Sequence, residues 1–257
     1  MSIYQHFRPE EKEFIDQVIN WRQYVEDSYA PKLTDFLDPR EQKIVNTIIG
    51  QNSDVKVAFA GGTKASERKR ALLYPSYYEP TEDDFQLSIY EIAYAKKFVR
   101  LEHPQVLGSI MSLGLSRSKF GDILIKAGDV QLIVCKDVED YIRLQLESIG
   151  KAKVELKLID KDSVIALEEE WVEMSTTLAS LRLDATIAAI YNISRQKAQV
   201  YIASSLVKVN WAAVENASFS CEEGDVISVR GHGRSVIKSL EGKTKKDKWR
   251  VVVGKLK

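Results

Sequence analysis

The stretch SLRLDATIAAIYNISRQKAQVYIASSLVKVNWAAVENASFSCEEGDVISVRGHGR, residues 180–234, contains two short helical patterns followed by strand-like pieces. Leu183, Ile187 and Ile190 recur at three- and four-residue spacing, which predicts one helix with an apolar stripe. Ser194 stands where an N-cap residue would begin a second helix, which carries Ala198, Val200, Tyr201 and Ile202. The pieces LVKVN, AVENAS and DVISVRG are typical of short strands. We therefore expect a small α+β module here.

The charges of the chain are unevenly distributed, although the formal net charge is zero. Residues 181–257 carry 14 basic and 7 acidic side chains, whereas residues 1–180 carry 23 basic and 30 acidic ones. A basic module on an acidic body suits a protein that brings one end to phosphates, because contacts between cations and phosphates supply most sequence-independent affinity for nucleic acids. The lysines at 243, 245, 246 and 248 could form a solvated tail, but they explain only part of the excess.

Several cations of the module fall where the backbone could also contact a phosphate. Arg195 and Lys197 lie in the first turn of the predicted second helix, whose free N–H groups favour an anion. The sequence from Arg230 to Arg234 places two more cations on a loop whose glycines allow close approach to RNA. This arrangement predicts a binding surface and not a catalytic one.

Residues 1–78 are expected to form an N-terminal α/β domain. Apolar residues recur at helical spacing between Phe14 and Val25, and Asp38 with Pro39 has the form of an N-cap and first residue of a second helix. An apolar strand, VKVAFA, then leads into a Gly-Gly pair. Such a pair after a strand can cradle phosphate, but the rest of a nucleotide-binding fingerprint is missing, so a turn is favoured.

Residues 79–165 are expected to form a second domain with the order strand, helix, strand, strand, helix, strand. The predicted elements are 85–94, 104–113, 122–127, 130–135, 138–149 and 154–159. This order is that of ferredoxin-like folds and RNA-recognition motifs. RNA-recognition motifs stack bases on aromatic residues of the third strand, and GDVQLIVC has none. Base stacking on this sheet is therefore not expected, although Arg117, Ser118 and Lys119 could meet phosphates.

Composition limits the other classes of function. Cys135 and Cys221 have no CxxC spacing and the chain has three histidines, so we expect neither a zinc site nor a disulfide framework. No run approaches the roughly 20 apolar residues that span a bilayer, and the N-terminal sequence lacks a basic region followed by an apolar one. The sequence therefore predicts a cytoplasmic protein without membrane insertion. Residues 162–177, with an acidic run at 168–170, are expected to be a connector or the start of the last module.

The ordered motifs RLD, SRQKA, VKVN and EEGDVISVRG closely resemble the RNA-binding domain named after ribosomal small-subunit protein four. That domain also occurs in pseudouridine synthases, tyrosyl-tRNA synthetases and small heat-shock ribosome-binding proteins. One departure is Trp211, which stands where members commonly carry glycine after the asparagine and so affects the shape of that turn. The resemblance implies that Arg182 and Arg195 are the principal RNA contacts. The complete set of predicted RNA-binding residues is Arg182, Ser194, Arg195, Gln196, Lys197, Lys208, Asn210, Arg230, His232 and Arg234.

The upstream motifs FLDPREQ, FAGG followed by ERKRALLYP, and GSIMSLGLSRSKFGDILI resemble the YlmH family of Gram-positive bacteria, so the similarity spans nearly the whole chain. Such proteins are encoded beside cell-division genes, and the family is implicated in the rescue of obstructed large ribosomal subunits. The resemblance implies that the last module contacts large-subunit ribosomal RNA and peptidyl-tRNA while a nascent chain is extended without a template. It predicts a protein of ribosome-associated quality control, and not an enzyme.

Two alternative functions remain. Arg182, Leu183, Asp184 and Thr186 match the RLDxxT motif that bears the catalytic aspartate of pseudouridine synthases. In those enzymes the aspartate lies on a loop, whereas IAAIYNISRQKA continues as helices, so we expect structural hydrogen bonds from Asp184. Residues 1–165 show no nucleophile paired with a base, no metal-ligand cluster and no P-loop. The other alternative is a cell-division adaptor whose N-terminal domains bind a division protein.

The predicted fold class is therefore α+β in three parts. These are an N-terminal α/β domain (1–78), a ferredoxin-like domain similar to RNA-recognition motifs (79–165) and a C-terminal RNA-binding domain (166–257, core 181–240). We expect a monomer that requires no metal and no cofactor.

Overall fold

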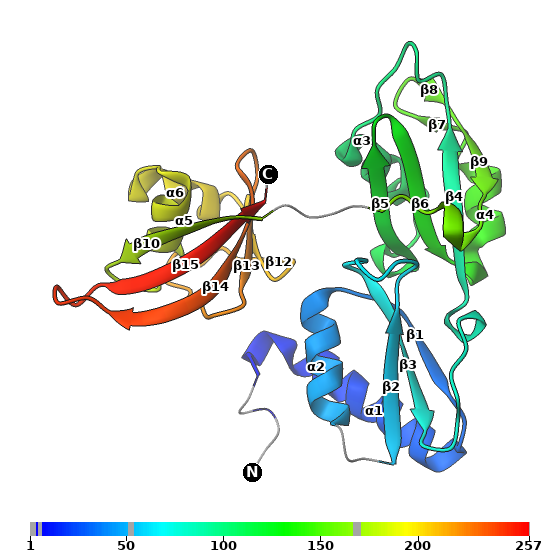
Figure 1. Cartoon of the computed structure of the whole chain (residues 1–257), viewed down its shortest axis with the longest axis horizontal. Coiled ribbons are helices and arrows are strands. Elements are labelled where there is room, and N and C mark those ends of the chain that lie inside the picture. The colour runs from blue at the N-terminus through cyan, green and yellow to red at the C-terminus, as the bar shows by residue number, and fades with distance from the viewer. Residues whose placement is uncertain (1–3, 5–6, 51–53, 167–170, 257) are drawn as a thin grey trace. The chain divides into compact units, whose positions relative to one another are not determined.

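The computed structural model describes residues 4, 7–50, 54–166 and 171–256. The chain folds into two compact units, Met1–Leu167 and Glu168–Lys257, which are considered separately (Figure 1). Both combine helices with antiparallel sheets, which confirms the predicted α+β class. Within the described ranges, no helix has the length and apolar character needed to cross a bilayer.

The first unit begins with two helices packed on a small sheet. Its elements are η2 (Pro9–Glu11), α1 (Lys12–Ser28), β1 (Lys32–Leu37), α2 (Pro39–Ile49), β2 (Val55–Ala60) and β3 (Lys69–Pro75). The strands are antiparallel in the order β1-β3-β2, and α1 and α2 contribute to one core with Leu73 and Ala71 of β3. The predicted start of α2 is confirmed, because Asp38 Oδ1 accepts a hydrogen bond from Glu41 N (2.9 Å) and Pro39 is the first helical residue.

The Gly-Gly pair forms a turn that is closed on itself. Gly62 has φ +93°, and Ser66 Oγ donates to the carbonyl oxygen of Gly61 (2.6 Å). A Cβ at Gly61 would lie 2.3 Å from the carbonyl oxygen of Arg68, so only glycine fits there. The prediction of a turn, and not of a phosphate cradle, is therefore confirmed. The basic stretch that follows continues as the central strand β3, which local periodicity did not indicate.

The rest of this unit has the predicted ferredoxin-like element order. Its main elements are β4 (Leu87–Ala93), α3 (His103–Met111), β5 (Phe120–Lys126), β6 (Asp129–Cys135), α4 (Glu139–Gln145) and β9 (Glu155–Leu158). Shorter elements are η3 (Asp83–Phe85), η4 (Arg117–Lys119), η5 (Lys136–Val138), β7 (Ser148–Ile149), β8 (Ala152–Lys153) and η6 (Lys161–Ser163). The four long strands form one antiparallel sheet in the order β5-β6-β4-β9. The helix expected over 138–149 is shorter: it ends at Gln145, and the chain continues into the β7–β8 hairpin, whose turn contains Gly150 at φ +58°.

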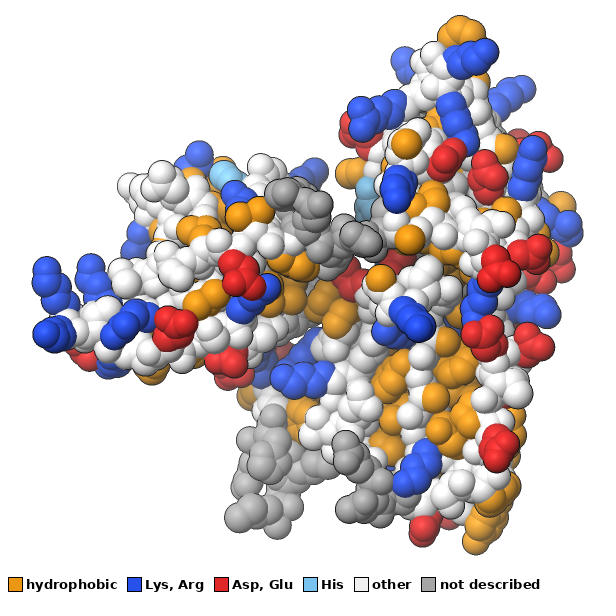
Figure 2. Space-filling model, in the orientation of Figure 1, with side chains coloured by type: hydrophobic (Ala, Val, Ile, Leu, Met, Phe, Trp, Pro, Cys, Tyr) orange, Lys and Arg blue, Asp and Glu red, His pale blue; other side chains and the backbone are white. Residues whose placement is uncertain are grey.

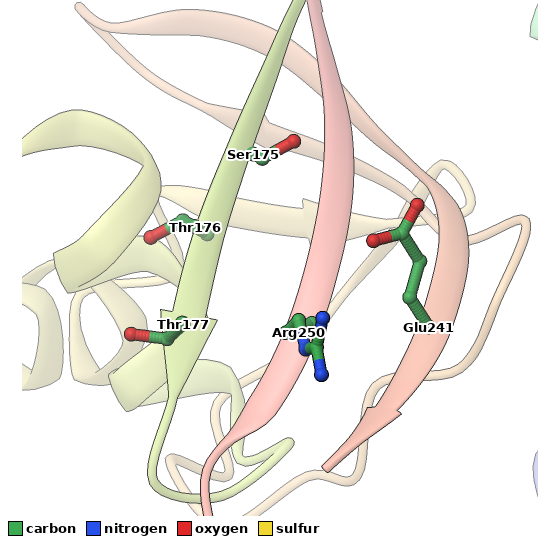
Figure 3. A pocket seen from close by; sticks show the side chains of 5 residues that line it. All are labelled: Ser175, Thr176, Thr177, Glu241 and Arg250. Atoms are coloured by element: carbon green, nitrogen blue, oxygen red, sulfur yellow. The ribbon is translucent and has the colours of Figure 1, made fainter. Parts of the chain in front are cut away.

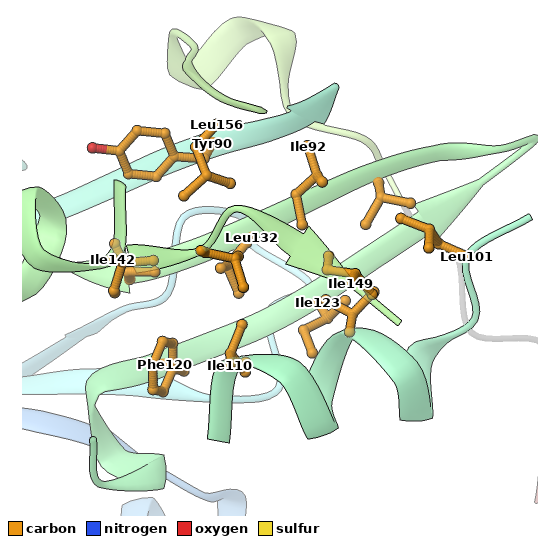
Figure 4. Close-up of a cluster of buried hydrophobic side chains, with 14 of the residues drawn as sticks. Tyr90, Ile92, Leu101, Ile110, Phe120, Ile123, Leu132, Ile142, Ile149 and Leu156 are labelled. Carbon is orange, nitrogen blue, oxygen red and sulfur yellow. The ribbon is translucent and has the colours of Figure 1, made fainter. Parts of the chain in front are cut away.

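One face of this sheet packs on α3 and α4. Ile110 of α3, Ile142 of α4 and Leu132 of β6 meet in a core that Figure 4 shows between the sheet and the helices. Val99 and Leu101, from the segment that joins β4 to α3, enter the same core. That segment is therefore anchored by two apolar side chains.

The opposite face of the sheet is covered as well. Phe36 of β1 packs on Ile133 of β6, and a Cβ at Gly121 would lie 2.8 Å from the Phe36 ring. The segment after β9 covers the neighbouring part, where Gln131 Nε2 donates to the carbonyl oxygen of Ser163 (2.9 Å) and Gln131 Oε1 accepts from Ile165 N (2.8 Å). RNA-recognition motifs stack bases on this face. Here it lies inside the unit.

The second unit is a six-stranded sheet with two helices. Its elements are β10 (Trp171–Leu178), α5 (Leu183–Tyr191), α6 (Arg195–Ala203), β11 (Val207–Val209), β12 (Ala212–Ala213), β13 (Val226–Val229), β14 (Gly233–Lys243) and β15 (Trp249–Leu256). The strand order is β10-β15-β14-β13-β11-β12 (Figure 1). Both helices share one core with the sheet, to which Ile187, Ile202 and Ile227 contribute. The two predicted helices and the Ser194 cap are confirmed.

Three details of the second unit differ from expectation. Trp171–Leu178 is the edge strand β10 and not a connector, and the acidic run at 168–170 lies outside the described residues. Of AVENAS (213–218), only Ala213 lies in a strand, the short β12. Lys243 ends β14, and the lysines at 245, 246 and 248 lie in the turn to β15 and not in a tail. The cause is long-range pairing: Trp171 lies opposite Leu256, and local periodicity carries no information about such partners.

Candidate nucleic-acid interface

Two predicted RNA contacts, Arg182 and Arg195, are held by the same buried carboxylate. Arg182 is the N-cap residue of α5 and Arg195 is the first residue of α6. Arg182 donates from Nε to Asp184 Oδ1 (3.1 Å) and from Nη2 to Oδ2 (3.2 Å). Arg195 donates from Nε to Oδ2 (2.9 Å) and from Nη2 to Oδ1 (3.2 Å), and Gln199 Nε2 also donates to Oδ2 (2.8 Å). The carboxylate thus fixes the orientation of both guanidinium groups.

The electrostatics of this cluster leave one positive charge facing solvent. Asp184 is fully buried, whereas the side chains of Arg182 and Arg195 keep 40% and 53% of their surface exposed. Burial by itself raises the pKa of Asp184, but hydrogen bonds from Arg182, Arg195 and Gln199 outweigh it and hold that pKa well below its usual value. The carboxylate is therefore ionised at neutral pH, and the two arginines with it carry a net charge of +1.

The same geometry bears on the match to the pseudouridine synthase motif. Both oxygens of Asp184 accept hydrogen bonds, and Oδ1 also accepts from Ala185 N (2.9 Å). With no exposed surface, this carboxylate has no oxygen free to approach a substrate. The structural hydrogen bonds expected of Asp184 are confirmed.

The first turn of α6 presents the next group of predicted residues. Ser194 Oγ accepts from Lys197 N (3.1 Å), which confirms the cap. Gln196 and Lys197 are exposed, and Lys197 Nζ lies 5.8 Å from the centre of the Tyr201 ring one turn later. These side chains and Arg195 thus extend from one helix end.

His232 joins this side of the module through two tyrosines that the sequence did not suggest. Its Nε2 lies 3.2 Å from Tyr201 Oη, and its ring centre is 5.3 Å from that of Tyr201 and 5.4 Å from that of Tyr191. Tyr191 is buried, which raises its pKa, and donates to the carbonyl oxygen of Gly233 (3.1 Å). The sequence marks Tyr191 and Tyr201 only as helix residues, since their partner is distant along the chain. Arg230, in the adjoining turn, is exposed.

Lys208 and Arg234 lie on the opposite face of the sheet. Lys208 of β11 and Arg234 of β14 lie on either side of Ser228 of β13. Their sequence neighbours, such as Val209 and Ile227, face the helices, so the row with Ser228 points the other way. Arg234 lies over the ring of Trp211, 5.9 Å from its centre. The structure thus places Arg182, the residues at 194–197 and His232 around the helices, and Lys208 and Arg234 on the other face.

Asn210 has a structural role in the β11–β12 turn. Its Nδ2 donates to Asp225 Oδ1 (2.7 Å), and its Oδ1 accepts from Val226 N (3.0 Å). Asn210 and Trp211 have φ of 49° and 67°, the left-handed values that a two-residue hairpin of this kind requires. The turn therefore keeps the shape expected with glycine, although tryptophan occupies the strained position.

The three residues proposed to meet phosphates in the first unit are engaged internally. Arg117 donates to the carbonyl oxygens of Phe120 (2.5 Å) and Gly121 (3.2 Å), and burial lowers its pKa to about 10. Lys119 pairs with Asp35 (2.8 Å) and Asp137, and Ser118 Oγ donates to Asp35 (3.2 Å). The contacts with Asp35 join the two parts of the unit.

Figure 3 shows an open pocket on the sheet of the second unit, lined by Ser175, Thr176, Thr177, Glu241 and Arg250. Its hydroxyl groups and single pair of opposite charges do not form a nucleophile activated by a base. Across the described parts of the chain, no three His, Cys, Asp or Glu side chains are grouped to hold a metal ion.

Comparison with known proteins agrees with this architecture. Residues 10–78 match the family described as "YlmH, N-terminal", residues 80–163 match "Putative RNA-binding domain in YlmH", and residues 181–227 match "S4 domain". The chain is 48% identical over 250 residues to "Ribosome-associated protein quality control protein P2" of Bacillus subtilis (strain 168), covering 97% of each. A solved structure, "Cell division protein ylmH from Streptococcus pneumoniae", is 35% identical with a TM-score of 0.56, covering 64% of this chain and 100% of that one.

The fold and the basic surface of the second unit define an RNA-binding protein with a C-terminal S4 domain. The identity over nearly the full length, together with the matches to both upstream domains, shows that the chain belongs to the YlmH family. It is thus a homologue of a ribosome-associated quality control protein, and none of these matches indicates an enzyme family.

Proposed function

We propose that this protein binds ribosomal RNA and tRNA on the large ribosomal subunit and acts in quality control of stalled translation in the cytoplasm. The observation that carries the proposal is the pair of half-exposed guanidinium groups, Arg182 and Arg195, held by Asp184 at the start of the two helices. In this proposal residues 166–257 form the RNA-binding domain, and residues 1–78 and 79–165 are further domains.

Three features support the proposal. The guanidinium groups are pre-oriented, so little side-chain entropy is lost when they meet a phosphate. Residues 181–257 carry an excess of seven positive charges, and Figure 2 shows lysine and arginine side chains gathered at the β14–β15 turn of this unit. The Bacillus subtilis relative is named for association with the ribosome.

The test is co-sedimentation with purified large ribosomal subunits over a salt series. Substituting the arginines alone would leave Asp184 as a buried charge, so the informative variant is Arg182→Gln with Arg195→Gln and Asp184→Asn. This variant loses one net positive charge, whereas the control Lys245→Ala with Lys246→Ala loses two. We expect the first to bind far more weakly and the control nearly normally, with both folded by circular dichroism. A greater loss in the control would show that only net charge matters.

The salt dependence gives a second readout. Removal of one cation from a phosphate should reduce the logarithmic salt slope by about 0.7 to 0.9. Removing both arginines should therefore reduce it by up to about 1.8 units, while the control leaves it nearly unchanged.

A cell-division adaptor is the second candidate, favoured by the name of the pneumococcal structure. An adaptor of that kind would not travel with large subunits, so the same sedimentation separates the two functions. We further propose that the protein is not an enzyme. Purified protein incubated with ribosomal RNA or tRNA should produce no pseudouridine. Formation of one or more pseudouridines per protein molecule would contradict this.

A further inference from the structure

We infer that the first unit carries a separate site for single-stranded RNA at the tip formed by residues 94–102, where Phe98 stacks on a base and Lys97 and Arg100 contact the flanking phosphates. This tip joins β4 to α3 and projects at one end of the ferredoxin-like part (Figure 1). The site lies outside the S4 domain and does not use the sheet.

The first argument is that the sheet cannot perform the stacking. The face of β6 that would carry it holds Gln131, Ile133 and Cys135, which are all buried under β1 and the segment after β9. An RNA base could reach this face only if the unit opened. Any contact with bases in this part of the chain must therefore come from its periphery.

The second argument is the exposure of Phe98. Its side chain is 87% exposed, more than any other large apolar side chain in the described ranges. The neighbouring Val99 and Leu101 are packed in the core, and Phe98 N and Val99 N both donate to the carbonyl oxygen of Ala95 (3.0 and 3.2 Å). The hydrogen bonds fold the tip into a turn, and the packing of Val99 and Leu101 anchors it to the unit, so the backbone presents the Phe98 ring to solvent. An exposed aromatic ring on an anchored backbone is what base stacking requires.

The third argument is the charge around the ring. Lys97 and Arg100 are exposed, and within the described residues neither side chain has an ion-pair partner. Lys96, by contrast, pairs with Asp129 and with Glu91 (3.4 Å), so its charge is already shared between two carboxylates at this end. The sequence KKFVR therefore places an exposed ring between two unneutralised cations.

Further cations lie on the adjoining turns. Tyr94 Oη donates to the carbonyl oxygen of Gly128 (2.8 Å), which ties the tip to the β5–β6 turn with Lys126. Ala93 pairs with Glu155, which brings the β7–β8 hairpin with Lys151 and Lys153 to the same end. Figure 2 shows lysine and arginine side chains gathered at this end of the unit. An aromatic ring flanked by two exposed cations fits a nucleic-acid strand better than an apolar protein segment.

The test uses the full chain carrying Arg182→Gln, Arg195→Gln and Asp184→Asn, so that the proposed S4 contact is already removed. Binding of a fluorescein-labelled, single-stranded 12-nucleotide RNA of mixed sequence is measured by anisotropy. Adding Phe98→Ala should weaken binding about 5- to 150-fold, the range expected for one stacked base. The matched control is Leu144→Ala, which removes another exposed apolar side chain (67%) of the same unit and should leave the affinity unchanged.

Two more variants separate stacking from charge. Phe98→Trp should retain the affinity, and its added indole fluorescence should be quenched when RNA binds. Lys97→Ala with Arg100→Ala should reduce the logarithmic salt slope by about 1.4, whereas Lys136→Ala with Lys157→Ala should not.

Equal affinity in Phe98→Ala and Leu144→Ala, or an unquenched Phe98→Trp, would overturn the inference. Because the background lacks the arginine pair, a positive result stands even if ribosome sedimentation fails. A negative result leaves the proposed function untouched.

Discussion

Replacing Asp184 by asparagine should lower the free energy of unfolding of the C-terminal module. The carboxylate is fully buried and accepts hydrogen bonds from Arg182, Arg195 and Gln199. Asparagine keeps the shape, but it turns one acceptor oxygen into a donor that faces guanidinium N–H groups. The substitution thus removes the charge that holds both arginines.

The size of the loss follows from burial and partners. Removing one member of a buried ion pair costs about 3–5 kcal/mol, and hydrogen bonds to charged groups contribute about 1.5–3 kcal/mol. Both guanidinium groups are about half exposed and water can solvate them again, so we expect a loss of about 2–4 kcal/mol. For a unit of this size that lowers the melting temperature by at least about 8 °C.

Tryptophan fluorescence suits the measurement, because Trp171, Trp211 and Trp249 lie in the C-terminal unit and Trp21 lies in the first. The control is Asp247→Asn, which removes an exposed partner of Lys243 and should cost less than about 0.5 kcal/mol. The lowered pKa of Asp184 means that its contribution is full above about pH 4 and falls as the pH drops below that value. Equal stability of the two variants would contradict this account. So would a stability difference between wild type and Asp184→Asn that stays the same in acid.

Three further outcomes are expected. Burial beside Asp38 raises the pKa of Glu41 to about 7. The free energy of unfolding of the first unit should therefore fall by about 1–3 kcal/mol as the pH rises from about 4.5 through 7, measured by urea unfolding. Glu41→Gln should flatten this decline. Trp211→Gly should change the unfolding free energy by less than about 1 kcal/mol, because glycine relieves the strain of the left-handed backbone while the contact of the ring with Arg234 is lost. Trp211→Val should be clearly destabilising, because a β-branched residue is strained at this left-handed φ. Gly121→Val should destabilise the first unit by at least about 2 kcal/mol, since its side chain would collide with the Phe36 ring, while Gly114→Ala, with open space around it, should show a smaller loss in the same thermal melts.

Local patterns were sufficient for much of the fold. Asp38 with Pro39 and Ser194 mark helix starts by chemistry confined to one turn, and both caps form. The order of the ferredoxin-like elements follows from the alternation of helical and strand periodicity. Five longer strands, β1, β3, β10, β14 and β15, were missed, because each is recognised by its partner across the sheet and not by its own sequence.

The candidate site shows the same division. The sequence by itself determined where the positive charge lies and which motif carries Arg182 and Arg195, since charge and motif order are properties of the chain. Only the tertiary structure decided that both arginines share Asp184, that His232 joins Tyr191 and Tyr201, and that Lys208 and Arg234 occupy the other face. It also decided that the sheet of the first unit is closed to RNA while Phe98 stays exposed. Burial and pairing depend on residues brought together from distant positions, and no local spacing in the sequence records them.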